Sequence, residues 1–214
     1  MNDLLYSAIF ISKGILITLQ LLVCGISIGL ILGLLASIGR YKGIAKTPIN
    51  SIISVIRGTP LILQLAFVYF ALPGLTGIKL NIIMAGIITF GLNSSAYVAE
   101  ILRAGINNIP KGQFEAAKAL KIPNYPMWKD IILPQVIKNV LPAMISEIIA
   151  LLKETSLIAT IGGMDIMRSA QTVAAEQFTY FTPLCIAGVY YYTLVLFIEH
   201  IGRILEKKVN HANS

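Results

Sequence analysis

Two carboxylates inside a long apolar segment are the residues of this sequence best placed to do chemistry. Glu147 and Glu154 lie seven residues apart among Ile, Leu and Ala, and Lys153 precedes the second. This spacing puts both carboxylates on one side of a helix, while Lys153 points elsewhere. Because an unpaired charge is costly in a hydrocarbon environment, we expect Glu147 or Glu154 to meet a cationic group of a ligand. The alternative is that Lys153 forms an internal salt bridge that fixes helix packing.

A second polar set occupies the end of another apolar segment. Asn93, Tyr97 and Glu100 are spaced by four and then three residues, so they share one helical face, and Ser94 lies beside the first. These side chains are predicted to line an interior pathway. Amides and hydroxyls are equally suited to hydrogen bonds between helices, and Glu100 has Arg103 within pairing distance along the helix.

The third set surrounds a predicted break in a helix. Arg57-Gly58-Thr59-Pro60 is followed by Gln64, and Gly with Pro loosens a helix. A broken helix at membrane depth is tolerated where protein or a water-filled cavity satisfies the freed backbone groups. Arg57 and Gln64 are therefore candidate pathway residues, and for Arg57 a role as an anchor at the membrane interface is the equal alternative.

Composition identifies the elements that must position these residues. The 214-residue chain is 56% hydrophobic and 13% charged, with a mean hydropathy of +0.78. A soluble domain of this length cannot bury so much apolar surface, so the sequence predicts an all-α integral membrane protein that forms one domain over residues 1–214. The predicted spans are residues 14–38, 49–72, 81–100, 135–161 and 182–205, each long enough for a hydrocarbon core of about 30 Å. Glycines 25, 29 and 33 in the first span indicate close helix packing.

Charge predicts the orientation of the five spans. The net charge of +7 is spread over short loops, which is a topology signal rather than a nucleic-acid-binding stripe. With the amino terminus outside, twelve basic residues lie in the cytoplasm and only Lys13, Lys79 and Arg168 lie outside. The twelve are Arg40, Lys42, Lys46, Arg103, Lys111, Lys118, Lys121, Lys129, Lys138, Arg203, Lys207 and Lys208. Cys24 and Cys185 lie in apolar stretches and give no disulfide or metal signal.

The longest polar interval, residues 107–133, is predicted to be a structured cytoplasmic loop. Pro110 suits the first turn of a helix, Pro123 and Pro126 interrupt it, and Pro134 is expected to close a second short helix. The loop is either an amphipathic segment on the bilayer surface or a docking element for a soluble partner, against which its apolar face is buried.

Three motifs in this chain resemble those of ABC importer permeases. Glu115-Ala116-Ala117 followed by Ile132-Leu133-Pro134 resembles the EAA loop, with Lys121 at the usual Gly position, where the turn is either not left-handed or mildly strained. Residues 57–64 (RGTPL-x-x-Q) and 153–157 (KETSL) resemble signatures of the polar amino acid (histidine, glutamine and arginine) subgroup. The resemblance covers residues 14–208 and implies the type I importer permease architecture.

The resemblance also implies a mechanism and partners. The EAA loop would insert into an ATP-hydrolysing subunit, with Glu115, Ala116 and Ala117 facing it. The implied coupling residues are Glu115, Ala116, Ala117, Leu120, Lys121, Pro123 and Trp128. The expected partners are a dimer of ATP-binding subunits, a second permease copy or paralogue, an extracytoplasmic substrate-binding protein, the membrane lipid and an amino acid substrate, either glutamine-type or basic such as arginine. The expected location is the bacterial inner membrane.

The chain itself is not expected to be an enzyme. It contains no Gly-rich phosphate loop, so ATP and Mg²⁺ are expected on the partner ATPase, with no cofactor or metal on this chain. A membrane-embedded enzyme is disfavoured because the carboxylates have no His or Cys companion in a span. The main alternative function is a passive channel for small polar solutes, which would need no ATPase and would give residues 107–133 no role.

Overall fold

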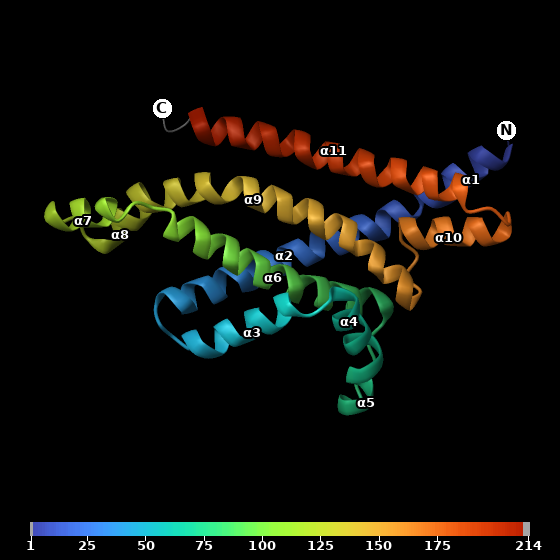
Figure 1. Cartoon of the computed structure of the whole chain (residues 1–214), viewed down its shortest axis with the longest axis horizontal. Coiled ribbons are helices and arrows are strands. Elements are labelled where there is room, and N and C mark those ends of the chain that lie inside the picture. Colours follow the sequence, from blue (N-terminus) through green and yellow to red (C-terminus); the bar gives the residue numbers. More distant parts are fainter. Residues whose placement is uncertain (1, 212–214) are drawn as a thin grey trace.

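The computed structural model describes residues 2–211, and these residues form helices joined by short connections, with no strand among them (Figure 1). This confirms the predicted all-α class. The helices are α1 (Asn2–Ser12), α2 (Gly14–Tyr41), α3 (Lys46–Gly58), α4 (Leu61–Ala66), α5 (Leu72–Thr76), α6 (Ile82–Asn107), α7 (Lys111–Ala119), α8 (Asn124–Pro126), α9 (Leu133–Glu154), α10 (Ile166–Glu176) and α11 (Phe181–His211). Wider π-helical turns form η1 (Phe67–Ala71) and η2 (Met127–Ile132), and a tighter 3₁₀ segment forms η3 (Thr155–Ile161).

Four continuous helices of the described chain are long and apolar enough to cross a membrane. They are Asp3–Tyr41, Ile82–Asn107, Asn124–Ile161 and Phe181–Val209. A fifth span is formed if the bent pair Lys46–Gly58 and Leu61–Thr76 counts as one, because these two segments meet at an angle of 104°. The break lies at Thr59 and Pro60, where the sequence predicts a loosened helix.

The fourth of these helices differs from the prediction. The sequence predicts that Pro134 closes a separate short helix, but residues 124–161 form one helix of 38 residues. The widened turn η2 carries the helix past the proline, because the Leu133 N–H bonds the carbonyl of Trp128, five residues back. Only α7 is therefore a separate helix of the 107–133 loop.

The core is built around a close contact between α2 and α6. A Cβ added at Gly29 would lie 2.7 Å from Ser94 Oγ, and one at Gly33 would lie 2.7 Å from Val98 Cβ. Glycine is required at both positions because a side chain would separate the helices. The buried residues Leu21, Leu65, Phe90 and Leu151 fill the core beside this contact.

Helix α9 crosses α6 and is covered on its other side by α11. Gly105 of α6 packs directly against Val140 of α9, and Gly202 of α11 packs against Ile145 of α9. Figure 1 shows α11 running along α9, with α10 and α1 at the end opposite α7. We call the end that carries α7 the loop end of the molecule.

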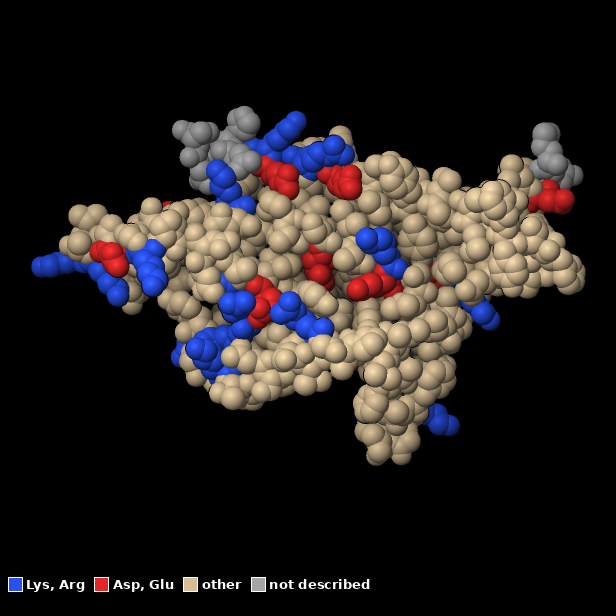
Figure 2. Space-filling model, viewed as in Figure 1, with Lys and Arg blue, Asp and Glu red and all other residues tan. Residues whose placement is uncertain are grey.

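Basic side chains gather toward the loop end (Figure 2). Arg40 lies in the last turn of α2, Lys46 begins α3, and Arg103 lies in the last turns of α6. The structure thus brings together residues that the charge count places on one side of the membrane. The orientation itself stays a prediction.

Candidate functional site

The two carboxylates of the fourth span lie next to the polar face of α6. The hydroxyl of Ser94, which is fully buried, donates a hydrogen bond of 2.8 Å to Oε1 of Glu147. Glu154 is half-buried about two helical turns further along, close enough to repel Glu147 electrostatically. Lys153 is exposed, and within residues 2–211 no ion pair neutralises either carboxylate. This arrangement offers negative charge to a cationic group and does not contain the Lys153 salt bridge that was the structural alternative.

The remaining polar residues of α6 divide into two groups. Asn93 is buried at the level of Ser94, with 4% of its surface exposed. Tyr97 lies nearer the loop end, and its ring lies 5.4 Å from the guanidinium carbon of Arg57. The face predicted from spacing is therefore not one continuous lining. Ser94 contacts a carboxylate and Asn93 is buried next to it in the helix, whereas Tyr97 belongs to a cationic cluster.

Glu100 is the centre of that cluster. Its Oε1 accepts a 2.6 Å hydrogen bond from Arg40 of α2, and its Oε2 accepts a 2.8 Å bond from Arg103 of the same helix. Arg57 of α3 lies 3.5 Å away from Oε2. The carboxylate thus ties three helices together at the loop end, and the predicted pairing with Arg103 is one of three interactions.

Gln64 satisfies the backbone at the helix break. Its Nε2 donates to the carbonyl of Ile56 at 2.7 Å, to the carbonyl of Thr59 at 3.1 Å and to Thr59 Oγ1 at 2.9 Å. The two carbonyls lack helical partners because α3 ends there. The RGTPL-x-x-Q pattern therefore has a local structural cause, because the glutamine closes the break that the proline opens. These bonds hold the Gln64 amide nitrogen at the helix break, so it is not free to line a pathway.

The turn after α7 is left-handed although it lacks glycine. Lys121 has φ 54°, the Ile122 N–H bonds the carbonyl of Ala117 at 2.9 Å, and the Lys121 N–H bonds the carbonyl of Lys118 at 3.0 Å. This is a Schellman motif with lysine at the position that glycine usually takes. Of the two alternatives left open by the sequence, the strained left-handed turn is the one the structure has.

The three residues of the EAA motif do not share one exposed face. Glu115 and Ala116 are exposed, but Ala117 has only 2% of its surface exposed and packs with Met127, Ile132 and other residues of the loop core. Ala117 therefore cannot face a partner together with Glu115 and Ala116, which differs from the expectation. Its small side chain lets α7 approach the start of the 124–161 helix instead.

Large apolar side chains remain exposed on the same loop. Leu120 is 74% exposed and Tyr125 is 75% exposed, with Pro123 exposed between them. Trp128 is half-buried, with its ring centroid 4.9 Å from that of Tyr41 and 6.2 Å from that of Phe114. Trp128 therefore holds the loop against α2, while Leu120 and Tyr125 form an apolar surface that is free for another molecule.

A buried carboxyl at the opposite end of the molecule was not predicted from the sequence. Asp165 falls in the connection between the fourth and fifth predicted spans, but the structure buries it completely. Asp165 Oδ1 accepts from the Arg168 N–H at 2.8 Å, which caps α10, and Oδ2 accepts from the Tyr191 hydroxyl at 2.9 Å. Burial raises the pKa of this carboxyl above its usual value, and the two hydrogen bonds act in the opposite direction. An aspartate shortly after Gly162-Gly163 is a typical N-cap residue, which was the available signal for the cap but not for the burial.

No metal site is formed by the described part of the chain. No group of three or more His, Cys, Asp or Glu side chains is close enough there to hold an ion.

Comparison with known proteins identifies related chains over nearly the whole length. The family described as "Binding-protein-dependent transport system inner membrane component" matches residues 25–211. The putative glutamine transport system permease protein of Rickettsia typhi is 47% identical over 203 residues, covering 94% of this chain and 93% of the relative. The arginine transport system permease protein of Bacillus subtilis is 46% identical over 202 residues, covering 94% and 92%.

Solved structures agree with these sequence matches. A chain of an amino acid ABC transporter crystallised with histidines superimposes with a TM-score of 0.86 at 36% identity, over 93% of this chain and 94% of that one. A chain of the MetNI methionine ABC transporter in an inward-facing conformation has a TM-score of 0.77 at 17% identity, over 94% and 96% of the two chains, and shows a shared fold alone. The architecture is that of an ABC importer permease.

Proposed function

Because the chain belongs to the family of inner membrane components of binding-protein-dependent transport systems, we propose that it imports a polar amino acid by alternating access, driven by ATP on partner subunits. Family membership and the permease architecture favour an importer subunit over the passive channel. The named relatives transport glutamine or arginine, which are both polar amino acids.

The carboxylates of α9 support a substrate that carries a second positive charge in addition to its α-ammonium group. Every amino acid carries an α-ammonium group, and one carboxylate suffices to bind it. Glu147 and Glu154 provide two, without an ion pair to either from the described residues. A second carboxylate gains most from a cationic side chain, so the site favours a basic amino acid such as arginine over glutamine.

The loop end supports docking of an ATP-hydrolysing partner. Glu115 and Ala116 are exposed together with Leu120 and Tyr125, so charged and apolar groups lie next to each other on a surface without a described partner. The proposal places this loop in the cytoplasm, where ATP is available. The complete importer would contain two ATP-binding subunits, with ATP and Mg²⁺ bound there, a second permease chain and an extracytoplasmic substrate-binding protein.

The observation that carries the proposal is the continuity of residues 124–161. One helix of 38 residues begins in the loop, contains Trp128, and continues to Glu147 and Glu154. A displacement of the loop by a partner therefore moves the carboxylates without passing through a flexible connection. This is the arrangement that coupling between a soluble motor and a membrane site requires.

Reconstitution into liposomes tests the proposal. The chain is co-purified with its ATP-hydrolysing partner, and uptake of radiolabelled arginine and glutamine is measured with the substrate-binding protein and with ATP at the loop side. We expect uptake that requires ATP, together with competition by polar amino acids and stronger competition by the basic ones. Uptake that proceeds equally without ATP would support the channel and refute the importer.

A further inference from the structure

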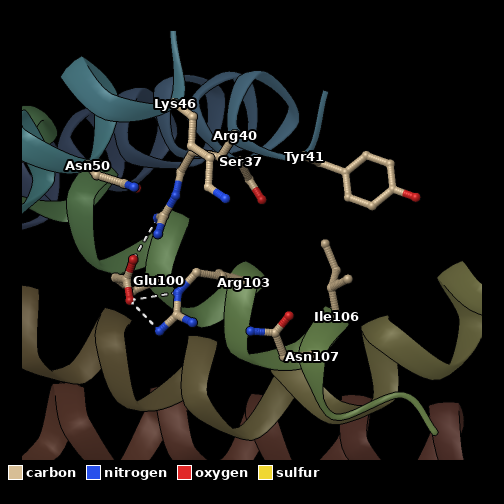
Figure 3. Close-up of a pocket in the computed structure, with 9 residues that line it drawn as sticks. All are labelled: Ser37, Arg40, Tyr41, Lys46, Asn50, Glu100, Arg103, Ile106 and Asn107. Atoms are coloured by element: carbon tan, nitrogen blue, oxygen red, sulfur yellow. Dashed lines mark hydrogen bonds and ion pairs between the residues drawn. The ribbon is translucent and has the colours of Figure 1, made fainter. Parts of the chain in front are cut away.

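A pocket of about 540 Å³ opens at the loop end between α2, α3 and α6 (Figure 3). Arg40, Lys46, Glu100 and Arg103 line it, and Figure 3 shows Lys46 and Arg40 on one wall with Glu100 and Arg103 on the other. The pocket lies away from Glu147 and Glu154, neither of which lines it. It is therefore separate from the proposed substrate site.

The pocket carries excess positive charge. Three cationic side chains face a single carboxylate, and both oxygens of Glu100 are already engaged, one by Arg40 and the other by Arg103. Arg57 adds a further cation beside the same carboxylate from outside the pocket wall. Lys46 forms no ion pair with any described residue. The cluster therefore has capacity for an anion, which the guanidinium groups and the ammonium group are suited to bind.

An apolar groove of about 520 Å³ adjoins the pocket. The two share Ser37, Tyr41 and Ile106, and the groove continues along Leu34 and Ile38 of α2. Its far wall includes Leu102 of α6, together with Trp128 and Val136 of the 124–161 helix. A small soluble anion would fill the pocket and leave this groove empty, whereas a ligand with a hydrocarbon chain would fill both.

We propose that the pocket and groove together bind an anionic phospholipid such as phosphatidylglycerol. The phosphate lies among Arg40, Lys46 and Arg103, and one acyl chain follows Leu34 and Ile38. Such a lipid contacts α2, α3 and α6 through its headgroup and reaches Trp128 through its chain. It thereby strengthens the packing of the coupling loop against the spans.

Native mass spectrometry of the purified full chain in mild detergent tests this site. Apparent Kd values are measured for phosphatidylglycerol and for zwitterionic phosphatidylcholine, for the unmodified chain and for two variants. We expect the unmodified chain to prefer phosphatidylglycerol. Lys46→Gln weakens phosphatidylglycerol binding about fivefold, as expected for the loss of one cation near a lipid phosphate. Ile38→Trp fills the groove and weakens binding about tenfold or more. Displacing only two methylene groups of the acyl chain from the groove already accounts for that factor.

Controls separate this site from general charge effects and from free phosphate. Lys208→Gln removes the same charge from an exposed position at the loop end and is expected to leave the Kd unchanged. Equal effects of Lys46→Gln and Lys208→Gln, or equal Kd values for the two lipids, would overturn the proposal. Inorganic phosphate is expected not to displace the lipid any better than sodium chloride of equal ionic strength. Specific displacement by phosphate, with Ile38→Trp still binding, would identify a soluble anion as the ligand and refute the lipid site.

Discussion

The hydroxyl of Ser94 on α6 and the Glu147 carboxylate on α9 are joined by a hydrogen bond of 2.8 Å. Ser94 is fully buried and lies against Gly29 of α2, so its position is fixed by the close contact between α2 and α6. The bond therefore orients Glu147 from a rigid surface. Glu154 forms no hydrogen bond or ion pair with its side chain within residues 2–211, so it is free to follow a ligand.

Replacing Glu147 tests the charge preference of the substrate site. Glu147→Gln keeps the shape and the bond to Ser94 but removes the negative charge. We expect the KM for arginine uptake to rise about tenfold to a hundredfold, the range for losing a hydrogen bond to a charged group, and the KM for glutamine to change less. Initial rates of labelled uptake in proteoliposomes measure both.

Ser94→Ala is the matched control for that experiment. It removes the orienting hydroxyl and leaves the charge in place, so both substrates are expected to lose similar, smaller factors. If Glu147→Gln changed the two KM values equally, the carboxylate would contact only the ammonium group that both amino acids share.

Lys121→Gly is expected to stabilise the coupling loop. Lys121 adopts φ 54°, a conformation that costs a residue with a side chain about 1 kcal/mol more than glycine. The substitution should raise the melting temperature of the purified chain. Lys118→Gly makes the same change inside α7, where glycine costs about 0.5–1 kcal/mol, and should lower it. Two shifts of the same sign would contradict the strained turn.

Glu115 is exposed and Ala117 is buried, so a substitution at Glu115 is expected to impair uptake and one at Ala117 to impair stability. Glu115→Arg reverses an exposed charge, so the chain should fold and keep its melting temperature while uptake falls about tenfold or more from like-charge contact at the interface. Ala117→Arg places a charge in the loop core and should destabilise the chain itself. Melting temperature, ATP hydrolysis and uptake are measured for both. Normal uptake by Glu115→Arg would count against the docking role.

Asp165 predicts a dependence of stability on pH. Burial raises the pKa of Asp165 in the folded chain above the unfolded value of about 3.9, so the folded state binds the proton more tightly. Stability therefore falls as pH rises from about 4 to the folded pKa and is constant above it. Asp165→Asn removes this titration, so the melting temperature of the unmodified chain should fall with rising pH relative to the variant.

A tyrosine variant checks the origin of that dependence. Tyr191→Phe removes a hydrogen bond that favours the charged carboxylate, so it should extend the fall in stability to higher pH. Equal pH profiles for the unmodified chain and Asp165→Asn would show that Asp165 does not cause the dependence.

The sequence predicts those features of the fold that depend on neighbouring residues alone. Apolar length predicts the long helices, and Gly58 with Pro60 predicts the break in the second span, although not its 104° angle. Pro134 was misleading because the widened turn η2 bypasses it, and that turn depends on packing rather than on local propensity.

Contacts between distant residues limited prediction of the site. Asp165 is buried by its contact with Tyr191, twenty-six residues further along, which no local pattern indicates. The inward direction of Ala117 depends on Met127 and Ile132 across the loop. Glu100 gathers Arg40 and Arg57 from two other helices, so only the Arg103 pair could be read from spacing.

The contact between Gly105 and Val140 is a pivot point about which the 124–161 helix can tilt. Val140 lies twelve residues after Trp128 and fourteen before Glu154, which at 1.5 Å per residue makes two lever arms of about 18 Å and 21 Å. Tilting about this point moves the two ends by nearly equal distances in opposite directions. A push of a few ångströms on the loop would therefore swing Glu154 about as far the other way, which is comparable to the length of the hydrogen bond that holds a substrate ammonium group.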